Sequence, residues 1–201
     1  MVRFHLLCVC LALTTLAPAA AAAAAANKPW GFQMWAATTY VAPLSETDQN
    51  FGGVRAAIKA SNEMGYQFGA EFRSGMIGLA IDYLHARHDI EQSNTGLLGA
   101  ADFNPISATL ALHLPTPLLE LSAGPTLSYV NWGDLDLTNG TQTSIDAKLG
   151  YGVSVCGDLP LGRSLAITGG MRWLKLKAEP NGATAVEVDP LITRIGLGLR
   201  F

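Results

Sequence analysis

The side chains that could do chemistry in this chain are charged residues set singly into segments of alternating apolar and small residues. Eight of them share this placement: Glu71, Asp82, Glu120, Asp146, Lys148, Arg172, Arg194 and Arg200. Successive side chains of a β-strand point to opposite faces, so these charges fall on the face opposite the apolar one. Charges enclosed away from water are tolerated when they are paired. We therefore expect an enclosed ion-pair network that fills and stiffens the structure, with ion conduction as the alternative.

Two histidines and their neighbours offer the donor types of a metal or catalytic site. His85, His88 and Asp89 could bind a metal, but histidines three residues apart do not share a strand face. His88 and Ser93 are the nearest histidine–serine pair that could serve an enzyme acting on lipid A, and no third partner stands near them. The chain has no spaced Cys/His zinc pattern and no Gly-rich phosphate loop. We expect neither an enzyme nor a cofactor.

The segments that must position the charges alternate with a period of two residues. In 191–201, one face carries mainly leucine and isoleucine and ends on Phe201, while the other carries glycine and arginine with Ile192 as its exception. Seven further segments repeat the pattern, at 32–41, 64–72, 76–83, 106–114, 119–129, 145–155 and 165–176. This pattern predicts eight strands. Pro125 falls within the fifth, where its missing N–H predicts a bulge or an earlier strand end.

The connections between these segments alternate between short and long. Short gaps stand at 73–75, 115–118 and 157–164, and longer ones at 42–61, 85–105, 132–143 and 177–190. Short periplasmic turns, longer external loops and an even strand number are typical of outer-membrane barrels. The polar faces hold glycine and serine, which suits a narrow lumen better than the wet exterior of a soluble β-sandwich or lipocalin-like barrel. We predict an all-β fold, an eight-stranded antiparallel transmembrane β-barrel of the outer-membrane type, formed by residues 27–201.

The N-terminal residues 1–26 are typical of a cleavable secretory signal peptide. Arg3 precedes an apolar stretch too short to span a bilayer, and the alanine run at 19–26 offers cleavage registers. Cleavage leaves 12 Lys and Arg against 16 Asp and Glu, without a basic cluster, which argues against a nucleic-acid partner. One cysteine, Cys156, then remains and excludes an internal disulfide. Charged residues are only 14% of the chain, and a barrel facing outer-membrane lipids needs no more.

Several short motifs follow one another along the chain. They are Thr39-Tyr-Val-Ala-Pro43, His88-Asp-Ile-Glu91, residues 105–113 with Leu114-Pro115, Gly124 with Tyr129, and Val188-Asp-Pro190 followed by Ile195-Gly-Leu-Gly-Leu-Arg-Phe201. In this order and spacing the chain resembles the outer-membrane protein W (OmpW) family over nearly all of residues 27–201. Pro125 departs from the family's pattern, and so does the third of the longer connections, 132–143, which is short for the family.

The resemblance implies a monomeric barrel with a narrow, largely apolar channel for small hydrophobic molecules or small ions. It also implies recognition of Phe201 by the barrel-assembly machinery. Continuing the register of 165–176 places Leu174 and Leu176 inside and Lys175 outside, either through a bulge or as an apolar constriction beneath the external loops. A channel with an apolar outer lumen, which could open sideways to lipid, is thus the first hypothesis. A sealed structural or adhesive barrel with interacting loops is the second, and a lipid A-modifying enzyme is the third.

Overall fold

The protein is described by a computed structural model. It covers residues 30–45, 47–51, 54–92, 96–114, 116, 118–180 and 186–201. The predicted signal peptide, residues 1–26, lies outside the described residues, and so does Ser93.

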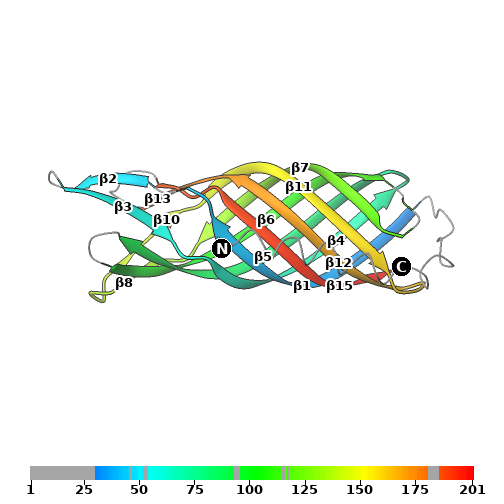
Figure 1. The fold of residues 1–201 in the computed structure, drawn as a ribbon, viewed down its shortest axis with the longest axis horizontal. Helices are drawn as coiled ribbons and strands as arrows, with labels where there is room; N and C mark the ends of the chain where they lie inside the picture. The colour runs from blue at the N-terminus through cyan, green and yellow to red at the C-terminus, as the bar shows by residue number, and fades with distance from the viewer. Residues whose placement is uncertain are drawn as a thin grey trace, which may run out of the picture.

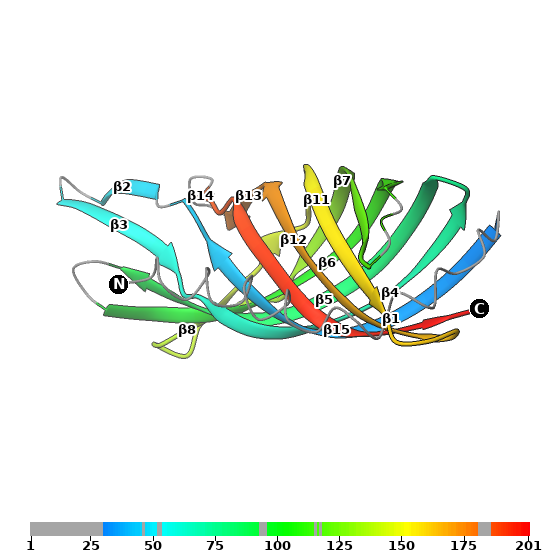
Figure 2. The ribbon, with the colours of Figure 1, turned by 45° about the vertical axis from the view of Figure 1, so that its right-hand side comes forward.

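Eight long strands form a closed antiparallel barrel (Figures 1 and 2). They are β1 (Trp30–Pro43), β4 (Glu63–Ser74), β5 (Ile77–Gln92), β6 (Gly96–Leu114), β7 (Glu120–Trp132), β11 (Lys148–Pro160), β12 (Leu165–Lys175) and β15 (Pro190–Arg200). Each pairs with the next along the chain, and β15 pairs with β1 from Gln33↔Arg200 to Pro43↔Pro190 to close the ring. Closure leaves no unpaired barrel edge. The predicted fold class is confirmed.

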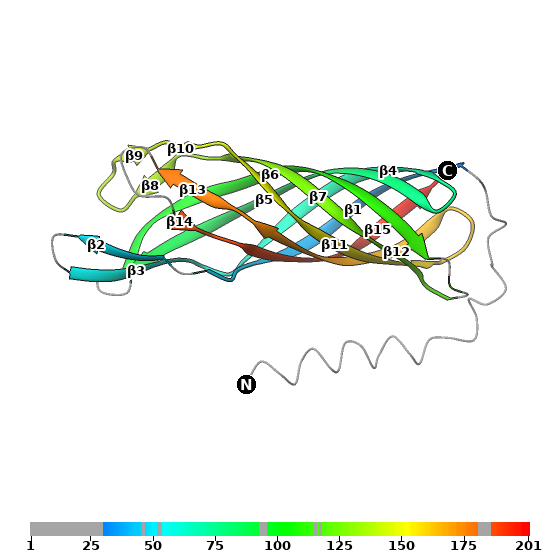
Figure 3. The ribbon, with the colours of Figure 1, turned by 90° about the horizontal axis from the view of Figure 1, so that it is seen from above.

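The longer connections carry short strands of their own at one end of the barrel (Figures 1 and 3). These are β2 (Thr47–Phe51), β3 (Val54–Ala60), β8 (Leu135–Leu137), β9 (Gln142–Thr143), β10 (Ile145–Asp146), β13 (Lys177–Pro180) and β14 (Val186–Glu187). The opposite end holds the short turns and the C-terminus. By the topology of outer-membrane barrels, we refer to the first end as external and the second as periplasmic.

The outer surface of the barrel is an apolar belt. Residues such as Ile77, Leu79 and Ile81 are about half exposed, whereas the side chains between them point into the lumen. Exposed Tyr and Trp side chains stand toward the external ends of the strands, and Phe32, Phe72 and Phe201 toward the periplasmic ends. This is the distribution of interfacial aromatic girdles around a lipid-facing band. The described residues contain no helix long and apolar enough to cross a membrane.

The prediction of a loop at 85–105 is wrong, because β5 continues to Gln92 and β6 begins at Gly96. Beyond Tyr83 the side chains still alternate between inward and outward positions, but the apolar residues now point inward and the polar residues outward. Leu84 and Phe103 point inward and are fully buried, while Arg87 points outward and is exposed. Polar residues on the outer face and frequent glycine made this stretch resemble a loop, although it is strand above the lipid belt.

The prediction of a bulge or strand end at Pro125 is also wrong. The register between β6 and β7 is the same on both sides of Pro125, from Thr109↔Thr126 to Leu112↔Ala123. Two bridge pairs are simply absent between them. A side chain at Gly124 would collide with the backbone carbonyl of Leu110, so glycine allows the close approach of β6 beside the missing proline N–H.

Candidate functional site in the barrel lumen

The periplasmic end of the lumen is crossed by a ring of ion pairs and hydrogen bonds, here called the periplasmic ring. The Arg200 guanidinium donates to Gln33 Oε1 at 2.9 Å, Glu120 Oε1 at 3.0 Å and Asp158 Oδ2 at 3.3 Å. Arg73 Nη1 reaches the other oxygen of Glu120 at 2.7 Å, and Gln33 Nε2 donates to Asp158. The five side chains come from five different strands, so the ring ties the barrel wall together across its interior.

The middle of the lumen is crossed by one bidentate ion pair, here called the crossbar. Arg172 on β12 donates to the two carboxylate oxygens of Asp82 on β5, at 2.9 and 2.5 Å. Three barrel strands separate β5 from β12 on either side, so the pair spans the diameter of the barrel. The side chains are 8% and 0% exposed. A paired, buried charge of this kind is tolerated because its hydrogen-bonding capacity is used.

Polar side chains continue the crossbar along the wall. Gln67 Nε2 donates to Asp82 Oδ1 at 2.6 Å, and Arg172 Nε donates to Ser154 Oγ at 2.9 Å. From Ser154 a chain of hydroxyl contacts runs to Thr126 at 2.7 Å and on to Thr109 at 2.8 Å. These contacts tie the crossbar to β4, β11, β7 and β6.

Two further charges, Glu71 and Arg194, line a cavity beside the crossbar. Glu71 on β4 forms a short contact with Nε2 of His113, which lies on β6. Arg194 on β15 stacks its guanidinium over the Trp35 ring, 4.7 Å from the centroid, and donates to Cys156 Sγ at 3.3 Å. A cation over an indole face is attracted by the ring's quadrupole.

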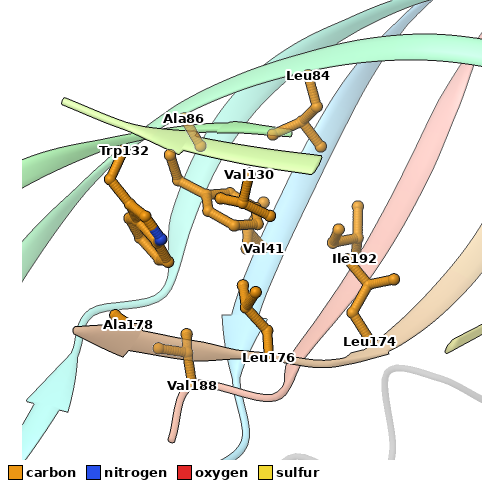
Figure 4. Packing of buried hydrophobic residues seen from close by; sticks show 11 residues of the cluster. Val41, Leu84, Ala86, Val130, Trp132, Leu174, Leu176, Ala178, Val188 and Ile192 are labelled. Carbon is orange, nitrogen blue, oxygen red and sulfur yellow. The ribbon is translucent and has the colours of Figure 1, made fainter. Parts of the chain in front are cut away.

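Above the crossbar, the external part of the lumen is filled by an apolar cluster, here called the apolar chamber (Figure 4). Its members are Val41, Leu84, Ala86, Phe103, Val130, Trp132, Leu174, Leu176, Ala178, Val188 and Ile192, none more than 9% exposed. They come from six of the eight barrel strands and from β13 and the residues beside it, and Figure 4 shows them pointing toward one another. Ile192, the exception in the sequence pattern of β15, belongs to this chamber.

Leu174 and Leu176 are held in the apolar chamber by a sharp corner at Asp189. Asp189 adopts a left-handed backbone conformation with φ 37°, and its Oδ1 accepts the N–H of Leu176 at 3.0 Å. Its Oδ2 accepts Lys175 Nζ at 2.6 Å. Burial raises the pKa of Asp189, but these hydrogen bonds outweigh it and the net shift is downward. The break between β12, which ends at Lys175, and β13, which begins at Lys177, is therefore held in place by hydrogen bonds to the Asp189 carboxylate.

The remaining predicted site residues lie elsewhere. Asp146 is exposed in β10, which pairs with β13 in a separate small sheet, away from the lumen network. Lys148 is the half-buried first residue of β11, opposite Val130. Phe201 is exposed at the periplasmic end, where its N–H donates to the Phe32 carbonyl at 2.9 Å and its ring lies 5.9 Å from that of Phe32.

The two histidines on β5 diverge. His88 points inward, is 3% exposed, and its Nδ1 contacts the Ser61 carbonyl at 2.8 Å. His85 points outward, stacks on Tyr66 and contacts Asn104 Oδ1 at 2.6 Å. Within the described residues, no three His, Cys, Asp or Glu side chains are grouped so as to hold a metal ion.

Sequence reasoning did not single out several lumen residues that complete the network: Gln33, Gln67, Arg73, His113, Asp158 and Trp35. Gln33, Gln67 and His113 stand on the polar face of their predicted segments, so extending the face assignment to every polar side chain would have found them. Arg73 and Asp158 fall in the predicted short gaps 73–75 and 157–164, into which β4 and β11 in fact continue. Trp35 has no such signal, because an aromatic residue on an inward position is usually read as core packing.

No model of a known protein family matches this chain, and no curated protein does. Solved structures do match. The outer membrane protein OprG from Pseudomonas aeruginosa aligns over 87% of this chain and 97% of its own, with a TM-score of 0.76 and 17% identity. This chain has the outer-membrane β-barrel fold.

Two more barrels are similar. The outer membrane protein AlkL, solved in DMPC lipid bilayers, aligns over 88% of this chain and 92% of its own, at TM-score 0.65 and 21% identity. Neisserial surface protein A (NspA) covers 86% and 96%, at 0.55 and 16%. Likeness at these identities establishes the fold, and membership of the OmpW family stays a prediction.

Proposed function

We propose that this protein is an OmpW-like outer-membrane channel that admits small hydrophobic molecules at its external end. The observation that carries the proposal is the apolar chamber, whose eleven buried side chains line the external lumen. An apolar solute that displaces these contacts exchanges them for its own and leaves water, which is favourable at roughly 25 cal/mol per Å² of buried apolar surface. At the external end of the barrel, beyond the lipid belt, the strands carry polar side chains on their outer face and apolar side chains on their inner face. A water-exposed entrance for an apolar solute requires this arrangement.

We propose further that the solute leaves the barrel sideways and does not reach the periplasmic end through the lumen. The crossbar and the periplasmic ring close the lower lumen with paired charges, which an apolar solute cannot replace. Beside the apolar chamber, pairing between β7 and β11 ends at Lys148↔Val130, although β7 continues to Trp132. We place the exit here, between two strands that are no longer bridged.

Uptake of a hydrophobic fluorescent dye such as N-phenyl-1-naphthylamine into cells with an intact lipopolysaccharide layer tests the proposal. The barrel should accelerate uptake several-fold over cells without it. Ala86→Phe, which adds a large side chain to the packed chamber at a position that is 1% exposed, should return uptake to background. Ala36→Phe, on the exposed face of β1, is the matched control and should behave like the native protein. Native uptake equal to that of cells lacking the barrel would overturn the channel.

A sealed structural or adhesive barrel is the second candidate, and the crossbar is the observation that favours it. Both candidates expect no steady ion conductance in planar bilayers, because paired side chains close the middle of the lumen. They differ in dye uptake, which only the channel accelerates. A lipid A-modifying enzyme has less support, since the buried His88 is engaged by the Ser61 carbonyl.

A further inference from the structure

Among the described residues, six buried side-chain polar atoms have no hydrogen-bond partner, and two of these six belong to side chains lining one cavity. These two are Gln67 Oε1 and Arg194 Nη1. Gln67 is 1% exposed, and its amide nitrogen is already committed to Asp82. The cavity is small and is also lined by Cys156, Ile192 and the crossbar residue Arg172. An unmatched acceptor and an unmatched donor therefore face the same small space.

The cavity lies directly below the apolar chamber. Ile192 lines the cavity and is also a member of the chamber. Arg194 follows Ile192 by two residues on β15, about 7 Å along the strand, on the same inward face. A molecule whose apolar body occupies the chamber can thus place a polar group in the cavity.

The charges around the cavity already balance. Arg172 is paired with Asp82, and Arg194 shares the larger neighbouring cavity with Glu71. Two guanidinium groups and two carboxylates are thus counted around the two cavities. The cavity therefore offers hydrogen-bonding capacity without an excess of charge, which favours a neutral polar group over an anion or a cation.

We propose that this cavity binds the hydroxyl group of a small hydrophobic alcohol or phenol. A hydroxyl is both an acceptor and a donor, so Arg194 Nη1 donates to its oxygen and its hydrogen is donated to Gln67 Oε1. A hydrocarbon of the same shape leaves both buried groups unmatched, which is costly. This inference rests on the proposed function, because the apolar body of the molecule enters through the chamber.

The test compares p-cresol with p-xylene, which differ by a hydroxyl in place of a methyl group. Binding to the full barrel in nanodiscs is measured by isothermal titration calorimetry, with empty nanodiscs as the blank. We expect p-cresol to bind about tenfold more tightly than p-xylene, as two neutral hydrogen bonds permit. The carboxylate p-toluate should bind more weakly than p-cresol.

Matched variants separate the cavity from the rest of the lumen. Gln67→Met and Arg194→Lys should each remove most of the preference for p-cresol while p-xylene still binds, which also reports that the chamber is intact. Gln33→Met and Arg200→Lys make the same changes in the periplasmic ring, on inward positions, and should leave the preference unchanged.

Equal binding of p-cresol and p-xylene, or tighter binding of p-toluate, would overturn the hydroxyl site and leave the channel standing. A preference that survives Gln67→Met and Arg194→Lys would also overturn it. Failure of all three compounds to bind would overturn the proposed function as well.

Discussion

At the scale of single residues, the crossbar is a buried ion pair in which each charge depends on its partner. Arg172→Met leaves Asp82 as an unpaired carboxylate that is 0% exposed in its side chain. Removing one partner of a buried pair costs about 3–5 kcal/mol, whereas replacing both with apolar residues is often close to neutral. We therefore expect Arg172→Met to destabilise the barrel by about that amount, and Asp82→Leu with Arg172→Met to recover most of it.

Urea unfolding in lipid vesicles, followed by tryptophan fluorescence, measures both effects. Arg73→Met is the control, because Arg73 belongs to a rim pair whose side chains are 24% and 21% exposed, and it should cost clearly less. A double variant no more stable than Arg172→Met alone would mean that the crossbar does not act as a pair.

His88 should make the contact between β5 and Ser61 at the external end sensitive to acid. Burial lowers the pKa of His88, and the Ser61 carbonyl and nearby carboxylates oppose this without outweighing it. Since the folded-state pKa lies below the unfolded value of about 6.5, the unfolded segment takes up the proton first. Stability is complete above that pH and is lost as the pH falls from there toward the folded-state value.

Hydrogen exchange of the Ser61 N–H, which donates to the Asp89 carbonyl at 2.7 Å, reports this local stability. After correction for intrinsic exchange, its protection should be lower at pH 5.5 than at pH 7.5 in the native protein. His88→Gln should remove that difference, whereas His85→Gln, on the outward face, should keep it. A difference that persists without His88 would assign the acid sensitivity to another group.

The sequence predicted which residues carry the lumen charges better than it predicted their partners. Alternation places Asp82 and Arg172 on inward faces, but their contact depends on β5 and β12 standing opposite each other in a ring of eight. That relation follows from barrel closure and strand stagger, which no local pattern encodes. Asp146 shares the alternating pattern and yet lies outside the lumen, because the strand ends its barrel pairing at Lys148.

At the scale of elements, the contact between β6 and β7 depends on Gly124. A Cβ there would meet the Leu110 carbonyl, which is backbone and cannot rotate away. We expect Gly124→Ala to destabilise the barrel by about 1–3 kcal/mol, the usual cost of overpacking. Gly31→Ala is the control, because nothing lies within 4 Å of its added Cβ.

The urea midpoint of each variant in vesicles measures the difference. An equal effect at the two glycines would show that the loss arises from glycine's general backbone freedom and not from the approach of β6. The eight strands themselves could be predicted from alternation, whereas this approach could not. The sequence suggests a bulge at Pro125 because proline has no N–H for the pairing of strands. In the structure, the preceding Gly124 lets β6 approach closely, and the register does not shift.

At the scale of the whole molecule, the pairing of β15 with β1 closes the barrel, and Phe201 lies just past the end of this pairing. Its backbone N–H and its ring both contact Phe32. These contacts are exposed and few, so they contribute little to the stability of a finished barrel. We propose that Phe201 acts mainly in assembly, as the resemblance to the OmpW family implies, through recognition by the barrel-assembly machinery.

Deleting Phe201 should therefore reduce the folded, membrane-inserted protein several-fold in cells, while the purified chain should still refold into lipid vesicles. The folded fraction is measured by the altered gel mobility of unheated samples. Phe32→Ala removes the same ring contact but keeps the terminal aromatic residue, and it should assemble normally. If deletion of Phe201 and Phe32→Ala reduced insertion equally, or if both failed to refold in vitro, the terminal residue would act through seam closure and not through recognition.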